Sequence, residues 1–339
     1  MKTVGLDRVR TATDSRALLH GIASPRWTVA IFVLLAAASL GVSEGGFSPT
    51  WLLLPPFVLL GVNLAAAVAT NARFRRDLPL LIFHLALVAL VLLFTVARLT
   101  YFEGTMTLTA ETEFDNAWLS ESRGPLHGDG PASLRFANDG FTEKFPARGE
   151  YQATYNRVRW WDESGRSHAA EIGDDTPLVI NGYRIYTTSR RGFSPMFRWE
   201  PAAGETEYGT VQLQEVESGV FAPAGEWQLE GGPKVWVMLD FEQLPQPRDG
   251  RLVARGAGEL QHHLVLRVGE LRQELRPGDV VALDGGKLAY VGMGSWMGYR
   301  VIYDPTKPWL VATTLVAVGS LLAFYARLLR RRPSLESSE

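Results

Sequence analysis

The sequence predicts a mixed membrane protein, in which four transmembrane α-helices, three N-terminal and one C-terminal, carry a large all-β extracytoplasmic domain. Three observations predict this class. Four apolar runs approach the length of about 20 residues that a helix needs to cross a bilayer. Basic residues gather on one side of these runs, and the long segment between the third and fourth runs alternates apolar with polar residues.

Composition excludes several classes of protein. The 339 residues include no cysteine, and 34 Lys+Arg stand against 36 Asp+Glu for a formal charge of −2. Without cysteine the chain has no disulfide, CxxC redox pair, thiolate zinc site, cysteine-held iron–sulfur cluster or CxxCH haem attachment. The balanced charge gives no basic footprint for nucleic acid. No GxSxG, P-loop or HExxH motif occurs, so we expect no catalytic residue in this chain alone.

The four apolar runs are read as membrane spans. The first three contain no Asp, Glu, Lys or Arg. An alternative for the first run is a cleaved signal peptide, because small residues occur at 36–39, although the 26 residues before the run make a long n-region. The runs cover residues 27–42, 51–70, 78–97 and 308–326.

The distribution of basic residues predicts the orientation of the spans. Twelve Lys and Arg flank one side, whereas the short loop 43–50 carries none. We therefore expect both termini and the second loop to be cytoplasmic. The twelve are Lys2, Arg8, Arg10, Arg16, Arg26, Arg73, Arg75, Arg76, Arg327, Arg330, Arg331 and Arg332.

The spans divide the chain into five predicted parts. A cytoplasmic N-terminal segment precedes three transmembrane helices, and an extracytoplasmic β-rich domain follows them. A fourth transmembrane helix leads into a cytoplasmic tail. The parts are residues 1–26, 27–100, 101–307, 308–327 and 328–339, in that order.

The segment 101–307 predicts a sandwich or barrel-like β domain, or two small ones. It holds 21 basic and 30 acidic residues, which give it a formal charge of −9. Asn181-Gly182 lies between β-forming residues and favours a tight type I′ hairpin. Asp284-Gly285-Gly286 favours a second hairpin. The Gly- and Pro-rich stretches 223–233 and 245–258 are expected to be loops.

His84 is the candidate site residue. It lies six residues into the third span, about 9 Å from its cytoplasmic end. An ionisable side chain inside a span indicates function by default, and a neutral imidazole can bind the iron of haem. The alternative is a hydrogen bond to a Thr, an Asn or a carbonyl of another span, with Asn63 as one candidate. The remaining spans contain no other His, so a second imidazole ligand would come from elsewhere.

Histidines outside the spans offer weaker candidates. His262 and His263 are adjacent on an expected strand, so they point to opposite faces and cannot chelate one ion together. His127 and His168 have no motif around them.

Short segments in order along the four-span frame match one known family. The matches are Ala23-Ser24, Ser39-Leu40-Gly41, Trp51, Asn63-Leu64, Phe83-His84-Leu85, Pro177-Leu178, Gly182-Tyr183-Arg184-Ile185-Tyr186, Tyr303-Asp304-Pro305 and Pro308-Trp309. With this pattern the chain resembles the ResB (CcsB) component of System II cytochrome c biogenesis. It lacks the Cys that some members carry in or near the membrane.

The resemblance implies a function shared with a second membrane protein of the ResC (CcsA) type. The pair receives haem, carries it across the bacterial inner (plasma) membrane and attaches it to CxxCH of an apocytochrome c. His84 would supply one axial ligand to the iron of a haem b near the cytoplasmic leaflet, and the partner would supply the other. The chain alone would be non-catalytic, within a holocytochrome c synthase complex whose other partners are haem, apocytochrome c and membrane lipid, with no nucleic acid.

Three further readings concern haem. Arg159-Trp160-Trp161-Asp162 resembles the tryptophan-rich motif of cytochrome c assembly proteins, but it ends an expected soluble strand, where packing is the simpler role. The main alternative function is a membrane-anchored extracytoplasmic β domain with a structural or protein-binding role and no haem. A quinone-linked cytochrome b subunit would need at least two pairs of intramembrane His.

Overall fold

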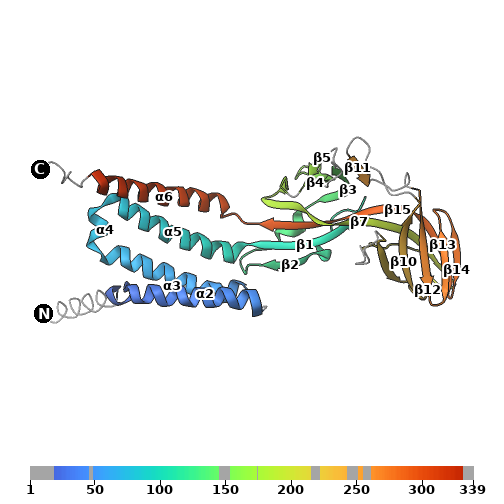
Figure 1. Cartoon of the computed structure of the whole chain (residues 1–339), viewed down its shortest axis with the longest axis horizontal. Helices are drawn as coiled ribbons and strands as arrows, with labels where there is room; N and C mark the ends of the chain where they lie inside the picture. The colour runs from blue at the N-terminus through green and yellow to red at the C-terminus, as the bar shows by residue number, and fades with distance from the viewer. Residues whose placement is uncertain are drawn as a thin grey trace, which may run out of the picture. The chain divides into compact units, whose positions relative to one another are not determined.

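The chain forms two compact units in the computed structural model (Figure 1). The helical unit comprises the chain up to Tyr101, the short segment Arg123–Gly128 and the chain from Asp304 onward. The β-rich unit comprises Phe102–Ser122 and Asp129–Tyr303. The structure describes residues 19–45, 49–144, 153–173, 175–214, 222–242, 251–254 and 261–330.

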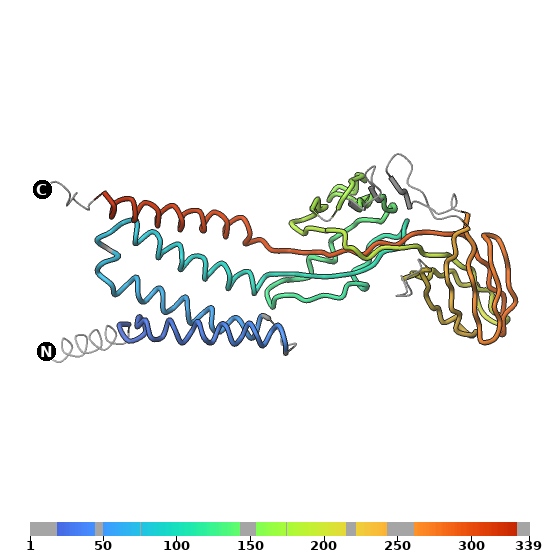
Figure 2. The backbone as a smooth tube through the Cα atoms, in the orientation of Figure 1, coloured from blue at the N-terminus to red at the C-terminus, as the bar shows by residue number. Residues whose placement is uncertain are grey.

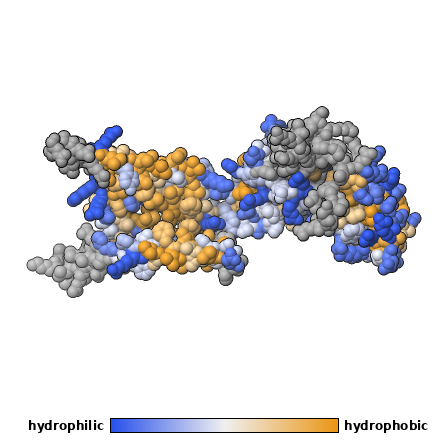
Figure 3. All heavy atoms as spheres, viewed as in Figure 1, coloured by the Kyte–Doolittle hydropathy of each residue, from blue (hydrophilic) through white to orange (hydrophobic). Residues whose placement is uncertain are grey.

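The four predicted spans are confirmed as long apolar helices (Figure 2). With four such helices the chain is a membrane protein. In the view of Figure 3, the surface over these helices is mainly apolar. The basic residues expected before residue 19 and after residue 330 lie outside the described part of the chain. The helices are α2 Pro25–Gly45, α3 Pro49–Thr70, α5 Leu78–Thr100 and α6 Lys307–Arg330, and the short α4 Ala72–Arg76 joins α3 to α5.

Small and aromatic residues let the first three spans pack. Ile31, Leu60 and Val91 form a buried cluster between α2, α3 and α5. Gly61 presents no side chain to Val91, and a Cβ there would lie 3.4 Å from it. Phe57 stacks on Phe94 with 5.9 Å between ring centroids. Because lipid tails offer no hydrophobic drive for helix association, this close packing holds the spans together.

Asn63 fastens α3 to the N-terminal end of α2. The Thr28 hydroxyl donates to Asn63 Oδ1 at 2.7 Å, and Asn63 Nδ2 donates to the Ile22 carbonyl at 2.6 Å. Both polar atoms of the Asn63 side chain are therefore engaged, one by Thr28 in α2 and one by Ile22 just before α2. Pro55 and Pro56 lie inside α3.

The described residues of the β-rich unit form three antiparallel sheets. The largest is built on two long paired strands, β7 and β15, whose register shifts twice. The strands of this sheet are β1 Phe102–Thr109, β2 Ser120–Arg123, β6 Leu178–Ile180, β7 Tyr183–Pro201, β8 Glu207–Thr210, β14 Val280–Leu283 and β15 Gly286–Tyr303.

Two four-stranded sheets complete the unit. One has the order β13-β12-β10-β9, and the other has the order β11-β3-β4-β5. Their strands are β3 Phe136–Lys144, β4 Ala153–Trp161, β5 Ser167–Ile172, β9 Ala224–Gln228, β10 Lys234–Phe241, β11 Arg251–Ala254, β12 His262–Val268 and β13 Leu271–Leu275.

Both predicted hairpins are confirmed, whereas both predicted loops contain a strand. Asn181 and Gly182 have φ of 50° and 83°, as a type I′ turn requires between β6 and β7. Gly285, at φ 85°, turns β14 into β15. Residues 223–233 contain strand β9, because Glu226 and Trp227 pair with β10 despite the neighbouring glycines. Of the stretch 245–258, the described residues 251–254 form β11, and the rest lies outside the described chain.

Candidate functional site

The corner between α4 and α5 positions His84. Asp77 is the residue before α5, and its carbonyl accepts the Leu81 amide at 3.0 Å. The Asp77 side chain makes no capping hydrogen bond, although Asp is a common N-cap residue. Pro79 lies in the first turn, where its missing N–H costs nothing. α5 begins at Leu78, so His84 lies near this end of the span, as the sequence predicts.

The hydrogen bond of the His84 ring selects one free nitrogen. His84 Nδ1 lies 2.8 Å from the Leu80 carbonyl oxygen, one helical turn earlier. A carbonyl only accepts, so Nδ1 carries the hydrogen and donates it. In the neutral ring Nε2 then keeps its lone pair. A metal-binding imidazole is oriented by the same arrangement, in which the second ring nitrogen donates to a carbonyl.

Phe74 covers one face of the imidazole. Its ring centroid lies 4.0 Å from that of His84, with 29° between the planes. Asn71 Oδ1 accepts the Arg73 amide at 3.0 Å, which caps the helix that carries Phe74. Phe83 meets the same imidazole edge-on at 5.2 Å. A stacked ring leaves the in-plane Nε2 lone pair uncovered while it restricts rotation of the imidazole.

The site has features that the sequence reasoning missed and others that it left open. Phe74 was not singled out, and its only signal was an aromatic residue within a basic loop next to the His84 span. The alternative that His84 bonds to Asn63 is not what the structure shows, since Asn63 binds Thr28 and Ile22. The carbonyl that His84 does bind belongs to its own helix.

A metal would find one ligand here. Within the described residues, no group of three His, Cys, Asp or Glu is arranged to hold an ion. One neutral imidazole with a free Nε2 fits a single axial position on haem iron, where the porphyrin supplies the four equatorial nitrogens. It does not fit a site that needs several protein ligands from this chain.

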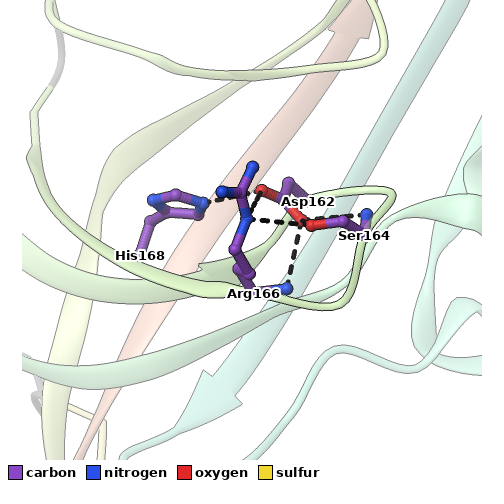
Figure 4. A network of polar contacts seen from close by, with 4 residues as sticks. All are labelled: Asp162, Ser164, Arg166 and His168. Atoms are coloured by element: carbon purple, nitrogen blue, oxygen red, sulfur yellow. Dashed lines mark hydrogen bonds and ion pairs between the residues drawn. The ribbon is translucent and has the colours of Figure 1, made fainter.

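A second imidazole belongs to a polar turn of the β-rich unit (Figure 4). His168 Nε2 lies 3.0 Å from Asp162 Oδ2, and Arg166 and Ser164 also donate to this carboxylate. The Ser164 hydroxyl bond, followed by the His168 bond, holds the pKa of Asp162 well below its usual value of 3.8. Trp160 stacks on His168 at 4.6 Å. Together they close the turn between β4 and β5.

The remaining candidates outside the spans have structural partners. His262 is buried and bonds to the Tyr290 hydroxyl at 2.7 Å, while His263 lies 3.5 Å from Asp240. The two rings therefore do not share a ligand, as predicted. His127 is buried, and its Nδ1 donates to the Thr100 carbonyl at 2.9 Å. The Arg135 guanidinium lies over Trp161 at 5.3 Å, so the RWWD segment packs within the β-rich unit.

Comparison with known proteins decides the family. The model of the ResB-like family matches residues 63–332, which include His84, the β-rich unit and α6. The chain belongs to the ResB-like family. Membership in the ResB-like family supports a role in cytochrome c biogenesis and the involvement of haem.

Two further comparisons add little. A solved structure titled "Cytochrome c Heme Lyase CcmF" aligns at 12% identity and a TM-score of 0.29, over 94% of this chain. The alignment spans 40% of that longer chain, and at this TM-score it carries no argument. No curated protein matches the chain.

Proposed function

We propose that this ResB-like chain is one component of a cytochrome c synthase complex, which carries haem across the membrane and presents it for attachment to CxxCH of apocytochromes c. The observation that carries this proposal is the His84 imidazole, whose Nδ1–H donates a hydrogen bond to the Leu80 carbonyl oxygen at 2.8 Å. Its Nε2 is thereby left as the ligand atom inside a membrane span.

His84 would hold a haem b through its iron as one axial ligand. Phe74 restricts rotation of the imidazole, and the Leu80 carbonyl fixes which nitrogen faces the metal. When bound, haem supplies the iron centre and the porphyrin that is finally joined to the cytochrome. Because this chain offers one intramembrane His, a membrane partner of the ResC (CcsA) type would supply the second ligand. The chain alone is then a haem-holding component and not an enzyme.

The positions of the basic residues support one topology for this complex. Arg26, Arg73, Arg76, Arg327 and Arg330 lie at the same ends of the four helices as the His84 corner. We place these ends in the cytoplasm of a bacterium, both termini with them, and the domain 101–307 outside the inner membrane. His84 would then meet haem at the cytoplasmic leaflet. The domain outside would meet the apocytochrome.

Difference spectroscopy of matched histidine variants tests the proposal. The chain is purified in detergent with and without a ResC-type partner as wild type, His84→Ala and His168→Ala. We expect a reduced-minus-oxidised b-type signal that requires the partner and disappears in His84→Ala. His168→Ala, which removes an imidazole with the same aromatic stacking, is expected to keep the signal.

Two outcomes would contradict the proposal. One is a b-type signal that survives His84→Ala. The other is a haem-free complex in a strain that matures cytochromes c normally with His84→Ala, which would favour a membrane-anchored binding or structural module.

A further inference from the structure

Residues Arg123–Gly128 lie far along the chain from α5, yet they close its C-terminal end. The Leu126 amide donates to the Leu99 carbonyl at 2.8 Å, and the Gly124 amide donates to the Tyr101 carbonyl at 2.9 Å. His127 Nδ1 donates to the Thr100 carbonyl between them at 2.9 Å. The last carbonyls of a helix have no partner within it. This segment supplies donors to the last two helix carbonyls, those of Leu99 and Thr100, and to the carbonyl of Tyr101, the residue after the helix.

Close packing holds the segment against the helix. Gly124 is buried, and a Cβ at this position would collide with the Leu99 carbonyl. His127 is also buried. Between these two anchors Pro125 and Leu126 are exposed, and the Leu126 side chain has 68% of its surface free. The tip is therefore fixed in position and presents an apolar side chain outward.

The hydrogen bonds set the level of this tip relative to the membrane. Leu99 lies inside the candidate span Leu78–Thr100, whose 23 residues reach about 34 Å, slightly more than the about 30 Å of hydrocarbon. The Thr50 hydroxyl donates to the Arg98 carbonyl at 3.3 Å and brings the first turn of α3 to this level. Trp51 in that turn is 67% exposed, as expected of a Trp at the membrane interface.

We propose that the Pro125–Leu126 tip is an interfacial anchor, which inserts into the lipid leaflet at the end of α5 that leads into β1. A single exposed Leu is ordinary on a soluble surface. Here the backbone of that Leu is bonded to the Leu99 carbonyl in the last turn of a candidate span, which holds the exposed side chain at the level of that turn. The anchor is independent of haem and of the role of His84.

Site-directed spin labelling measures the depth of this tip in the bilayer. The chain has no cysteine, so one introduced Cys is the sole labelling site. Leu126→Cys and Pro125→Cys are labelled with a nitroxide in the full chain. The chain alone is placed in phosphatidylcholine–phosphatidylglycerol vesicles at a low protein-to-lipid ratio. Collisions of the label with oxygen, which partitions into lipid, are compared with collisions with a water-soluble nickel chelate.

Two positions calibrate the measurement. Leu315→Cys in α6 has the same 68% exposure and reports the lipid-facing surface of a span. Glu163→Cys, in the exposed turn between β4 and β5, reports water. We expect both tip labels to collide several-fold more with oxygen than with the chelate, as Leu315→Cys does. Labels that follow Glu163→Cys, or that are shielded from both reagents by protein contact, would overturn the proposal.

Discussion

Two imidazoles, one in each unit, share a stacked aromatic neighbour but differ in their hydrogen-bond partners. His84 in α5 stacks on Phe74 at 4.0 Å, and His168 in β5 stacks on Trp160 at 4.6 Å. Each has a hydrogen bond on one ring nitrogen. The partner of His84 is a backbone carbonyl, whereas the partner of His168 is the Asp162 carboxylate.

The difference shows that the hydrogen-bond partner, more than the aromatic neighbour, decides what each imidazole can do. The Leu80 carbonyl accepts the Nδ1 hydrogen of His84, so the lone pair of the neutral ring lies on Nε2, where a metal could bind it. The Asp162 carboxylate accepts from His168, Arg166 and Ser164, so His168 is one member of an exposed hydrogen-bonded turn.

Asn63→Ala tests whether interhelical hydrogen bonding can be lost without loss of the proposed haem ligation, and it has the largest expected effect on stability. The change removes the bonds to Thr28 and Ile22, and bonds of this kind are worth about 0.6–2 kcal/mol in membranes. We expect a lower free energy of unfolding in detergent, measured by helical circular dichroism during denaturation. The b-type signal of the folded fraction should not change.

Thr95→Ala is the control for Asn63→Ala, since its hydroxyl bonds only to the Val91 carbonyl of its own helix at 2.9 Å. A loss of haem ligation in folded Asn63→Ala would show that Asn63 and His84 act together. It would contradict the view that the Leu80 carbonyl alone sets the role of His84.

Phe74→Leu removes the aromatic neighbour of His84 and keeps its carbonyl partner, so it separates the effects of the two contacts. An aromatic pair is worth about 0.5–1.5 kcal/mol, which corresponds to a loss of about 2- to 10-fold in haem retention. We also expect the low-spin ferric electron paramagnetic resonance signal to broaden as the imidazole plane becomes less restricted. Phe94→Leu removes a stacked ring elsewhere on α5 and should leave the signal unchanged. Equal effects of both variants would contradict a positioning role for Phe74.

The smallest expected effect is the response of the Asp162 turn to acid, measured as the NMR shift of one amide. The pKa of Asp162 is lowered by folding, so its bonds stabilise the turn above the unfolded value near 3.8 and are lost only as pH falls through the lower folded value. We expect the Ser164 amide, which donates to Asp162 Oδ1 at 2.9 Å, to keep its NMR position as pH passes 3.8.

The measurement uses ¹⁵N-serine labelling, with Ser164→Ala to assign the peak. Asp162→Asn, which has no carboxyl group to titrate, should abolish any acid shift of this amide. A midpoint close to 3.8 in the wild type would show that the turn does not hold the carboxylate as described.

The spans, the Asn181-Gly182 hairpin and the depth of His84 could be predicted from the sequence because each depends on local pattern. Apolar length predicts a span, and a residue pair that tolerates positive φ predicts a tight turn. Phe74 and the Leu80 carbonyl could not be predicted as partners of His84, because their contacts depend on how α4 turns against α5. The capping of α5 by Arg123–Gly128 joins residues 23 to 27 positions apart and left no local signal. Strand β9 was missed because pairing with β10 overrides its glycine content.

Chemical rescue of the ligand tests whether His84 Nε2 binds haem iron. His84→Gly is purified with the ResC-type partner, and free imidazole is added while the absorption and electron paramagnetic resonance spectra are recorded. We predict that the variant lacks the low-spin signal and that imidazole restores it, with no such response in His168→Gly. A His84→Gly complex with a normal low-spin spectrum before imidazole is added would contradict axial ligation by His84.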